Sequence, residues 1–313
     1  MSEGLAVGVI GVGYLGRYHA LIHSRHPGVR LVGVVDTNAD TAAKVAAEAG
    51  CRVFTDPAEL LPQVDAVSIV VPTTAHLDVA RPFLEAGKHV LLEKPIASSV
   101  AEGREIVRLA EQAGVVLQIG HLERFNAGVM ALAERIRRPR FIEAHRMSPF
   151  VARATDVDVI SDLMIHDIDI ILSLVDAAIV HISAVGSAVL TEHLDIANAR
   201  LEFDNGCVAN VIASRVSRDK MRRIRVFEPH RYQSLDFIEQ TLDVVYPQAV
   251  PGREWPEIVT ERLDIQAVKP LDAEIDAFVQ CVRTGTAPLV GGAVGQRALE
   301  VAVAVQEKIA ESR

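Results

Sequence analysis

Residues 5–16 read LAVGVIGVGYLG, an apolar run that leads into a glycine-rich turn and then into a helical pattern from Tyr14 to Ser24. This order predicts a buried strand, a tight turn and the beginning of a helix. Gly11 lets the strand turn, Gly13 lets the backbone approach a pyrophosphate, and Gly16 lets the helix pack closely on the strand. Backbone N–H groups and the helix dipole can then hold the anion. The stretch predicts a dinucleotide-binding turn with five candidate residues: Gly11, Gly13, Tyr14, Leu15 and Gly16.

A second apolar run, from Arg30 to Val35, ends in Asp36, which follows Gly16 by 20 residues. A carboxylate at this strand end can accept hydrogen bonds from both ribose hydroxyls of an adenosine, and it would repel a 2′-phosphate. Asp36 could instead be an ordinary cap or turn residue, since Thr37–Asp40 offers other capping side chains. In the order strand, turn, helix, strand and acid, the pattern favours NAD over NADP as the cofactor.

Helical and strand-like segments alternate as far as Gly120. We expect helices over 39–49, 75–86 and 100–113, a brief helix opened by Asp56-Pro57, and strands over 51–54, 66–71, 88–92 and 115–119. This alternation predicts an α/β Rossmann domain with a doubly wound parallel sheet, in which ligands lie at the carboxyl ends of the strands. The loops at those ends are Gly11–Gly16, Asp36, Pro72–His76, Glu93–Pro95 and Gly120–His121.

Past Gly120 the alternation stops, and strand-like runs follow one another. We expect helices over 127–137, 161–175, 271–284 and 295–311, a loop over 247–256, and strands over 141–149, 180–190, 197–203, 208–214, 223–227, 234–237 and 258–263. Strands in a block predict an α+β domain with a large, open, mostly antiparallel sheet. The expected division is an NAD-binding domain over 1–120 and a substrate-binding and oligomerisation domain over 121–313, whose last helix could pack back on the first domain.

The composition excludes several classes of function. The chain has 313 residues, half of them hydrophobic, and a net charge of −9, which argues against a general nucleic-acid binder. No apolar segment reaches membrane-spanning length, and no basic region precedes the first short apolar run, so neither a membrane protein nor a secreted one is expected. Three scattered cysteines, Cys51, Cys207 and Cys281, form no CxxC pair and fit small buried positions in a cytoplasmic protein.

Lys94 follows an apolar strand and precedes Pro95, which restricts it to an extended conformation. At the end of a parallel strand, its ammonium group would be directed at the cofactor edge of the sheet. Most lysines are simply solvated surface residues. A lysine in a Glu-Lys-Pro turn at a cofactor edge is nevertheless a candidate for the chemistry.

The helical segment 161–173 reads SDLMIHDIDIILS. At about 100° per residue, the polar side chains Asp162, His166, Asp169 and Ser173 fall on one narrow stripe of an otherwise apolar helix. A helix buried on most sides must direct such a stripe at a partner or a cleft. The alternatives are a hydrogen-bonded core histidine, an ion pair or a metal site; since no further ligand cluster stands out, no metal is expected.

Together, the glycine turn, Asp36, the Glu93-Lys94-Pro95 turn and the Asp162-Leu-Met-Ile-His166 segment resemble the glucose-fructose oxidoreductase / inositol dehydrogenase / MocA family over essentially the whole chain. The resemblance implies an N-terminal Rossmann domain, a nicotinamide cofactor and a cis peptide bond before Pro95. It also implies a C-terminal open sheet whose face often pairs subunits, and hence a homodimer or homotetramer.

The resemblance assigns Lys94, Asp162 and His166 to the catalytic group. It further implies cofactor contacts from the loops at the strand ends: Pro72, Thr73, His76, Glu93 and Lys94. Thr73 stands where the family has asparagine. The implied reaction is oxidation of a secondary sugar hydroxyl, with His166 as the base, because an imidazole pKa lies near 6.5. Lys94 would hydrogen-bond the reacting oxygen, Asp162 would orient His166 or bind a neighbouring hydroxyl, and the two basic residues could exchange roles.

The segment Gly120-His-Leu-Glu-Arg-Phe-Asn126 resembles the UDP-N-acetylglucosamine 3-dehydrogenase branch of the family, although Ala127 replaces the usual proline. It supplies the candidate substrate-binding residues His121, Arg124 and Asn126, to which Asp162 is added. A nucleotide sugar also needs cationic partners for its diphosphate. Arg215 and Arg218 lead a candidate group with Lys220, Arg222 and Arg223, although a solvated strand face is an equally ordinary reading of that run.

Two other functions stay open at the level of sequence. One is an inositol, polyol or other neutral-sugar dehydrogenase. The other is a non-catalytic sensor that binds NAD(H). The presence of both Lys94 and His166 argues against the sensor, which needs a dinucleotide site and neither of these residues.

Overall fold

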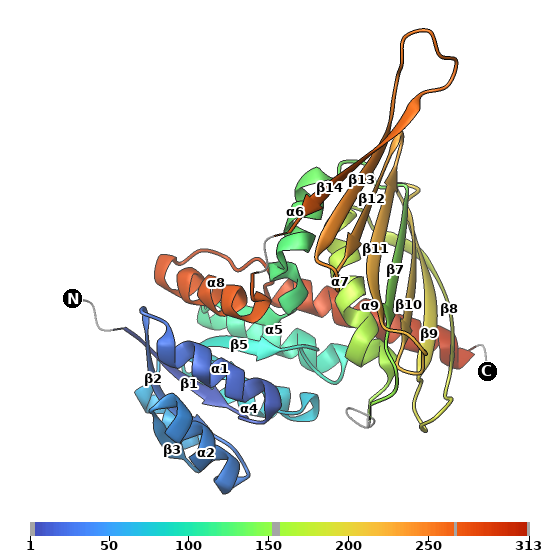
Figure 1. Ribbon diagram of the computed structural model, residues 1–313. Helices are drawn as coiled ribbons and strands as arrows, with labels where there is room; N and C mark the ends of the chain where they lie inside the picture. The colour runs from blue at the N-terminus through green and yellow to red at the C-terminus, as the bar shows by residue number, and fades with distance from the viewer. Residues whose placement is uncertain (1–3, 152–156, 266–267, 312–313) are drawn as a thin grey trace. The chain divides into compact units, whose positions relative to one another are not determined.

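The computed structural model describes residues 4–151, 157–265 and 268–311, and it divides into two compact units, each with its own sheet (Figure 1). The first unit holds the described residues up to Leu122 together with Lys269–Leu299. The second holds the remainder. No helix in the described ranges is long and apolar enough to cross a bilayer.

The first unit is built on a sheet of six parallel strands in the order β3-β2-β1-β4-β5-β6. This is the doubly wound order that the alternating pattern predicts. The strands are β1 (Leu5–Ile10), β2 (Val29–Val35), β3 (Arg52–Phe54), β4 (Ala66–Ile69), β5 (His89–Glu93) and β6 (Leu117–Gly120). The helices are α1 (Tyr14–Arg25), α2 (Ala39–Ala49), α3 (Pro57–Leu60), α4 (His76–Glu85), α5 (Val100–Ala113) and α8 (Pro270–Thr284), with short 3₁₀ turns η1 (Leu61–Gln63) and η2 (Thr73–Ala75).

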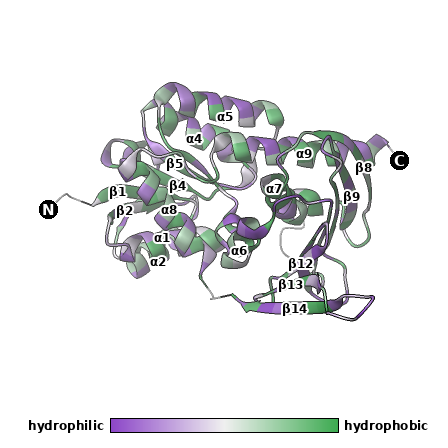
Figure 2. Cartoon of the chain, turned by 90° about the horizontal axis from the view of Figure 1, so that it is seen from above, coloured by the Kyte–Doolittle hydropathy of each residue, from purple (hydrophilic) through white to green (hydrophobic). Residues whose placement is uncertain are grey.

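Capping residues fix the ends of the helices. The Asn38 side chain accepts the Thr41 N–H at the start of α2, and Gly50 ends that helix with a positive φ of 66°. Ser99 caps α5 in the same way, and Gly114 ends it with a φ of 64°. Because these signals are local, both helices run over the residues that the sequence predicts. Figure 2 shows purple and green segments on α2 and α5, as expected for helices with one solvated and one buried face.

The segment Lys269–Leu299 belongs with the first unit, whereas the division by sequence assigned it to the second domain. The reason is apolar packing. Ile275 and Phe278 of α8 are buried in one cluster with Val7 of β1 and Ile22 of α1. The helix therefore completes the core on one face of the parallel sheet, although it follows the whole second sheet in the chain.

The second unit is built on an eight-stranded sheet in the order β14-β13-β12-β11-β7-β10-β9-β8. Its described strands pair antiparallel except β7 with β10. They are β7 (Phe141–Met147), β8 (Ile179–Ser187), β9 (Ile196–Phe203), β10 (Val208–Ser214), β11 (Met221–Glu228), β12 (Arg231–Asp236), β13 (Thr241–Gln248) and β14 (Glu257–Asp264). The helical elements are η3 (Leu122–Phe125), α6 (Ala127–Arg135), η4 (Ile160–Met164), α7 (Ile165–Leu174) and α9 (Gly292–Glu311), whose first turns, to Leu299, belong to the first unit.

Two features of the second unit differ from expectation. The strand β13 was not expected, and it covers the first two residues of the predicted loop over 247–256. The helix expected over 161–175 begins instead as a π turn, η4, before it becomes regular at Ile165. In a π turn, residues advance by less than 100°, so the expected single polar stripe does not hold across this junction.

Candidate functional site

The glycine turn after β1 has the geometry that a pyrophosphate site needs. Gly11 has a φ of 81°, and a Cβ added there would lie 2.5 Å from the Val70 carbonyl oxygen. A Cβ at Gly16 would lie 1.9 Å from the Gly11 oxygen, so α1 packs on the turn only because that atom is missing. Gly13 faces open space, since nothing lies within 4 Å of its Cβ position, and no side chain caps α1. The helix N-terminus is therefore available to an anion.

Asp36 lies at the end of β2, beside this turn. Its Oδ2 accepts the Val12 N–H at 2.7 Å and its Oδ1 accepts the Asn38 N–H at 2.9 Å. Each carboxylate oxygen keeps a further lone pair for a ribose hydroxyl. Asp36 thus joins the first two loops of the sheet edge, and the open space at Gly13 together with this carboxylate fits an adenosine diphosphate moiety.

The loop after β4 places its residues in two environments. Pro72 is exposed and Thr73 half-buried at the start of η2. His76 is buried instead, with Nε2 3.1 Å from the Val71 oxygen and Nδ1 3.3 Å from the Ile96 oxygen. Burial lowers the pKa of His76, so the ring is neutral and donates to one of the two carbonyls. His76 thereby joins this loop to the one after β5, and its ring nitrogens contact backbone oxygens.

The Glu93-Lys94-Pro95 turn follows β5. The expected cis peptide bond between Lys94 and Pro95 is present. Glu93 is buried, and its Oε2 accepts the Lys94 N–H at 3.2 Å, while the Lys94 side chain is half-buried. The carboxylate of Glu93 therefore contacts the backbone of Lys94, the candidate catalytic residue.

In the second unit, Asp162 and His166 lie on either side of the junction between η4 and α7, and both are half-buried. Asp158 fixes the start of this element, because its Oδ1 accepts the N–H groups of Ile160 and Ser161. π turns inside helices are frequent at functional sites. The end of the π turn therefore lies between Asp162 and His166, which are four residues apart in the chain.

The other acids of α7 have fixed cationic partners. Arg146 of β7 forms two hydrogen bonds of 2.9 Å with Asp167 and a third, also 2.9 Å, with Glu123. Arg124 lies 3.4 Å from Asp169. The network of Arg146, Asp167 and Glu123 could not be predicted, because the three side chains come from separate elements. In the sequence, the one sign of it is Asp167, a charged residue beside His166 on the face of the helix that was expected to be apolar.

Three of the residues expected to bind substrate have hydrogen-bond or ion-pair partners within the second unit. Asn126 is buried, accepts the Gly128 N–H as the cap of α6 and donates to Glu123. Arg215 is 5% exposed and donates to Asp195, to Thr191 and to the Val157 carbonyl oxygen. Arg124 pairs with Asp169. These polar groups have partners within the unit that stabilise its fold, and their part in binding a substrate stays a prediction.

Asp195 is the centre of the Arg215 cluster. It also accepts the backbone N–H groups of Val189, Leu190 and Thr191. Burial alone would raise the pKa of Asp195, but these hydrogen bonds and Arg215 outweigh burial and lower it. Arg215 therefore fixes the connection between β8 and β9, and a role for its guanidinium as a diphosphate ligand stays a prediction.

The roles of four other residues stay predictions, and the structure gives their positions. Arg218 is exposed in the turn before β11. His121 is buried after β6. Tyr14 is 74% exposed at the first position of α1, edge to face with Tyr18, and Leu15 beside it is half-buried. An exposed aromatic ring beside the glycine turn is compatible with a cofactor contact.

Two family models match consecutive parts of the chain. One, described as an oxidoreductase family with an NAD-binding Rossmann fold, matches residues 5–121. The other, described as the GFO/IDH/MocA C-terminal domain, matches residues 129–228. A UDP-N-acetylglucosamine 3-dehydrogenase from Acidithiobacillus ferrooxidans is 41% identical over 305 residues, which are 96% of this chain and 96% of the relative. Its solved structure superposes with a TM-score of 0.92, at 40% identity, over 98% of this chain and 97% of that one.

More distant relatives share the architecture. A scyllo-inositol 2-dehydrogenase (NAD(+)) from Bacillus subtilis is 28% identical over 97% of this chain and 94% of its own length. A levoglucosan dehydrogenase in complex with NADH and levoglucosan superposes with a TM-score of 0.88 over 99% of this chain and 98% of its own, at 19% identity. At that identity the similarity shows the fold alone.

Proposed function

Since the chain belongs to the GFO/IDH/MocA family of oxidoreductases, we propose that it oxidises the 3-hydroxyl of UDP-N-acetylglucosamine, or of a related nucleotide sugar, to a ketone. The observation that carries this proposal is the 41% identity to a UDP-N-acetylglucosamine 3-dehydrogenase along nearly the full length of both chains. The segment from His121 to Asn126, with the form His-Leu-Glu-Arg-Phe-Asn, supports the same branch of the family.

Bound nicotinamide supplies a hydride acceptor for the carbon that carries the hydroxyl. The chain's own residues bind the substrate and move the proton. His166 takes the hydroxyl proton as the base, and Lys94 hydrogen-bonds the reacting oxygen. Lys94 can share or relay that proton. Asp162 orients His166 or binds a neighbouring hydroxyl.

NAD is the preferred cofactor in this proposal. The support is Asp36, whose carboxylate already binds two backbone N–H groups and has lone pairs left for the ribose hydroxyls. A 2′-phosphate would bring a second negative charge to the same position. The Rossmann unit binds a nicotinamide dinucleotide, and the assay below compares NAD with NADP.

A second candidate is a dehydrogenase of a neutral sugar or polyol. One observation favours it: Arg215, the buried member of the suggested diphosphate group, is committed to Asp195. A nucleotide sugar would then have to find its cations elsewhere in the chain. The relationship to a scyllo-inositol 2-dehydrogenase over 97% of the chain supports the same alternative.

A single-turnover assay with near-stoichiometric enzyme separates these candidates. Formation of reduced nicotinamide is followed after UDP-N-acetylglucosamine, myo-inositol or free N-acetylglucosamine is added, with NAD and with NADP. We expect a burst with NAD and the UDP-sugar alone. A response only to neutral sugars would transfer the proposal to the second candidate, and no response to any of them would favour an NAD(H) sensor.

The same assay tests Lys94. Lys94→Met removes the ammonium and keeps a stem of similar length, so turnover should fall by about 10²- to 10⁴-fold. NADH binding, followed by fluorescence titration, should stay close to that of the wild type, because the glycine turn and Asp36 are unchanged. Normal turnover in Lys94→Met would refute the assignment.

We further propose that the chain forms a homodimer or homotetramer through the open face of the eight-stranded sheet. Alternate residues of β7 and β10 are buried, and the others are half-buried on that open face.

A further inference from the structure

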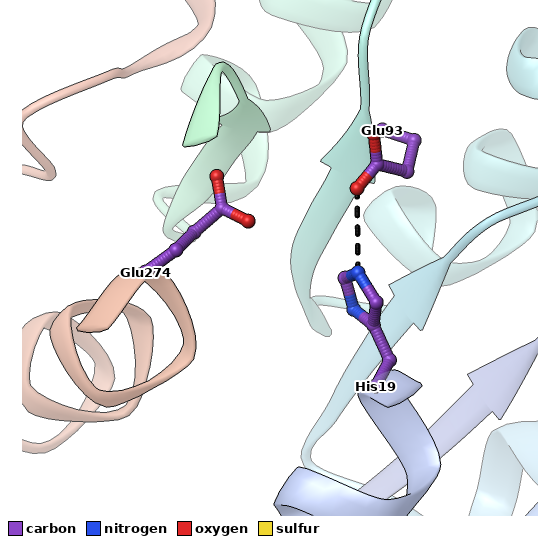
Figure 3. A group of neighbouring side chains, drawn as sticks. All are labelled: His19, Glu93 and Glu274. Carbon is purple, nitrogen blue, oxygen red and sulfur yellow. Dashed lines mark ion pairs between the residues drawn. The ribbon is translucent and has the colours of Figure 1, made fainter. Parts of the chain in front are cut away.

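A buried acidic cluster lies in the first unit behind the Lys94 turn. It consists of His19 from α1, Glu93 from the end of β5 and Glu274 from α8, and one ligand atom from each lies within 4.8 Å of the other two. The Nε2 of His19 is 3.3 Å from the Oε1 of Glu93. Figure 3 shows that the carboxyl group of Glu274 points toward this pair. All three side chains are buried.

Two carboxyl groups in a dry site cannot both be charged without a large cost. Neither oxygen of Glu274 has a hydrogen-bond partner among the described residues. Burial, and then the negative charge of Glu93, raise the pKa of Glu274 well above its usual range. His19 is the third member of the cluster, and the uncharged Gln118 of β6 donates to the Glu274 backbone oxygen at 2.9 Å. Glu274 is therefore the member of the cluster that holds a proton.

Glu93 is the member that contacts the Lys94 turn. Its Oε2 accepts the Lys94 N–H. A Cβ at Gly120 of β6 would lie 2.9 Å from the carboxylate, so the absence of a side chain there leaves just enough space for Glu93. The position of the Glu93 carboxylate thus determines where the backbone of Lys94 lies. A donor behind Glu93 would keep that carboxylate in place.

We propose that Glu274 is a positioning residue, whose protonated carboxyl group donates a hydrogen bond to Glu93 and thereby holds the Lys94 turn for the reaction. This inference rests on the proposed function of Lys94. The donor comes from a helix that follows the second sheet in the chain, outside the part that matches the Rossmann family model. The C-terminal segment therefore completes the support of a turn formed almost 180 residues earlier.

The competing explanation is a divalent cation held by the same three side chains, since His and Glu are common ligands. The two explanations differ in the charge of Glu274. A cation needs the ionised carboxylate, whereas the hydrogen bond needs the neutral acid. Glu274→Gln keeps the shape and a donor but has no charge, and it distinguishes the two.

The experiment compares Glu274→Gln, Glu274→Leu and Lys94→Met in the full-length protein. We expect Glu274→Leu to lower kcat by about 10- to 100-fold, through displacement of Lys94, with little change in the KM for either substrate. Glu274→Gln should restore kcat close to the wild-type value. Asp276→Asn, an exposed carboxylate on the same helix that contacts His26, is the matched control and should change neither constant.

The infrared spectrum provides a readout that does not depend on activity. The spectrum of the wild type minus that of Glu274→Gln should show the carbonyl-stretch band of a buried protonated carboxylic acid, because the buried Asp169 contributes equally to both spectra. The inference is overturned if the difference spectrum lacks this band or if the purified enzyme contains one equivalent of a divalent cation. It is also overturned if the Gln variant is as impaired as the Leu variant, or if the Leu variant is fully active. Loss of activity in Lys94→Met with a fully active Leu variant refutes this inference alone, whereas an active Lys94→Met refutes the proposed function.

Discussion

Asp169 is a buried carboxyl group in the middle of α7, and its protonation links the stability of the second unit to pH. Its side chain is 1% exposed and lies 3.4 Å from the Arg124 guanidinium. Burial raises the pKa of Asp169 to about 7, and Arg124 reduces only part of that shift. The folded protein therefore keeps a proton at pH values where an unfolded chain, with an aspartate pKa of ~3.9, has lost it.

We predict that Asp169→Asn removes a pH dependence of stability between about pH 4 and pH 7. In this window the folded wild type binds more protons than the unfolded chain, so its free energy of unfolding falls as the pH rises, by up to about 1.4 kcal/mol per unit. The contribution is complete below about pH 4 and lost above the folded pKa. Urea unfolding of both proteins across this range measures the difference.

Ile168→Val provides the control for this comparison, because it shortens a buried neighbour on the same helix and has no titratable group. It should lower the free energy of unfolding by about 0.5–1.5 kcal/mol at every pH. If the curves of the wild type and Asp169→Asn run parallel from pH 4 to pH 7, Asp169 is ionised throughout and the assignment of its proton is wrong.

At the scale of elements, Arg146 attaches the buried side of α7 to the sheet. Its three hydrogen bonds to Asp167 and Glu123 are buried, and its guanidinium lies 5.5 Å from the ring centre of Phe237. We predict that Arg146→Met lowers the free energy of unfolding by about 3–5 kcal/mol, because two buried carboxylates lose their cation. Denaturant unfolding at neutral pH measures it.

Arg200→Met is the matched control for Arg146→Met. Arg200 lies on β9 of the same sheet and pairs with Glu202, but its side chain is 45% exposed. Solvent screens that pair, so its loss should cost no more than about 1 kcal/mol. Equal losses in the two variants would mean that the buried network contributes no more than a surface ion pair.

The elements that could be predicted are those with local signals. The two glycine-capped helices follow from residues such as Asn38 and Gly50, which act on their own neighbours. The doubly wound parallel sheet of the first unit follows from the alternation of strands and helices up to Gly120. The strand β13 was missed because Pro247 interrupts its pattern. In the structure Pro247 pairs only with Ile258 of β14 and lies past Arg231, where β12 begins, so it needs no ladder hydrogen bond to β12.

The site shows the same limit. The glycine turn and the Lys94 turn are each a continuous stretch of the chain. Both were placed at the edge of the parallel sheet from sequence alone. The pairing of Arg215 with Asp195 was not predicted, because Asp195 lies 20 residues away and in no shared pattern. Glu274 was likewise missed, because its neighbours His19 and Glu93 are distant in the chain. Pairing between distant elements decides whether a charged side chain is free, and spacing along the chain carries no information about it.

At the scale of the whole molecule, the open face of the eight-stranded sheet is the surface most suited to a second copy of the chain. Phe141, Phe227 and Tyr232 come from the neighbouring strands β7, β11 and β12, with successive ring centres 5.7 Å and 5.3 Å apart. Ion pairs such as Arg225 with Glu143 lie beside them on the same strands. An aromatic row flanked by charged residues is typical of protein interfaces.

We predict that the wild type is a dimer or tetramer at micromolar concentration and that Phe227→Glu shifts it to a monomer, because burial of a carboxylate in an apolar interface is costly. Sedimentation velocity measures the distribution. Val53→Glu is the control, since Val53 is 42% exposed on β3 of the other sheet and should leave the assembly unchanged. Circular dichroism checks that both variants are folded. A monomeric wild type, or an assembly that survives Phe227→Glu, would exclude this face as the interface, and dissociation by Val53→Glu would transfer it to the first unit.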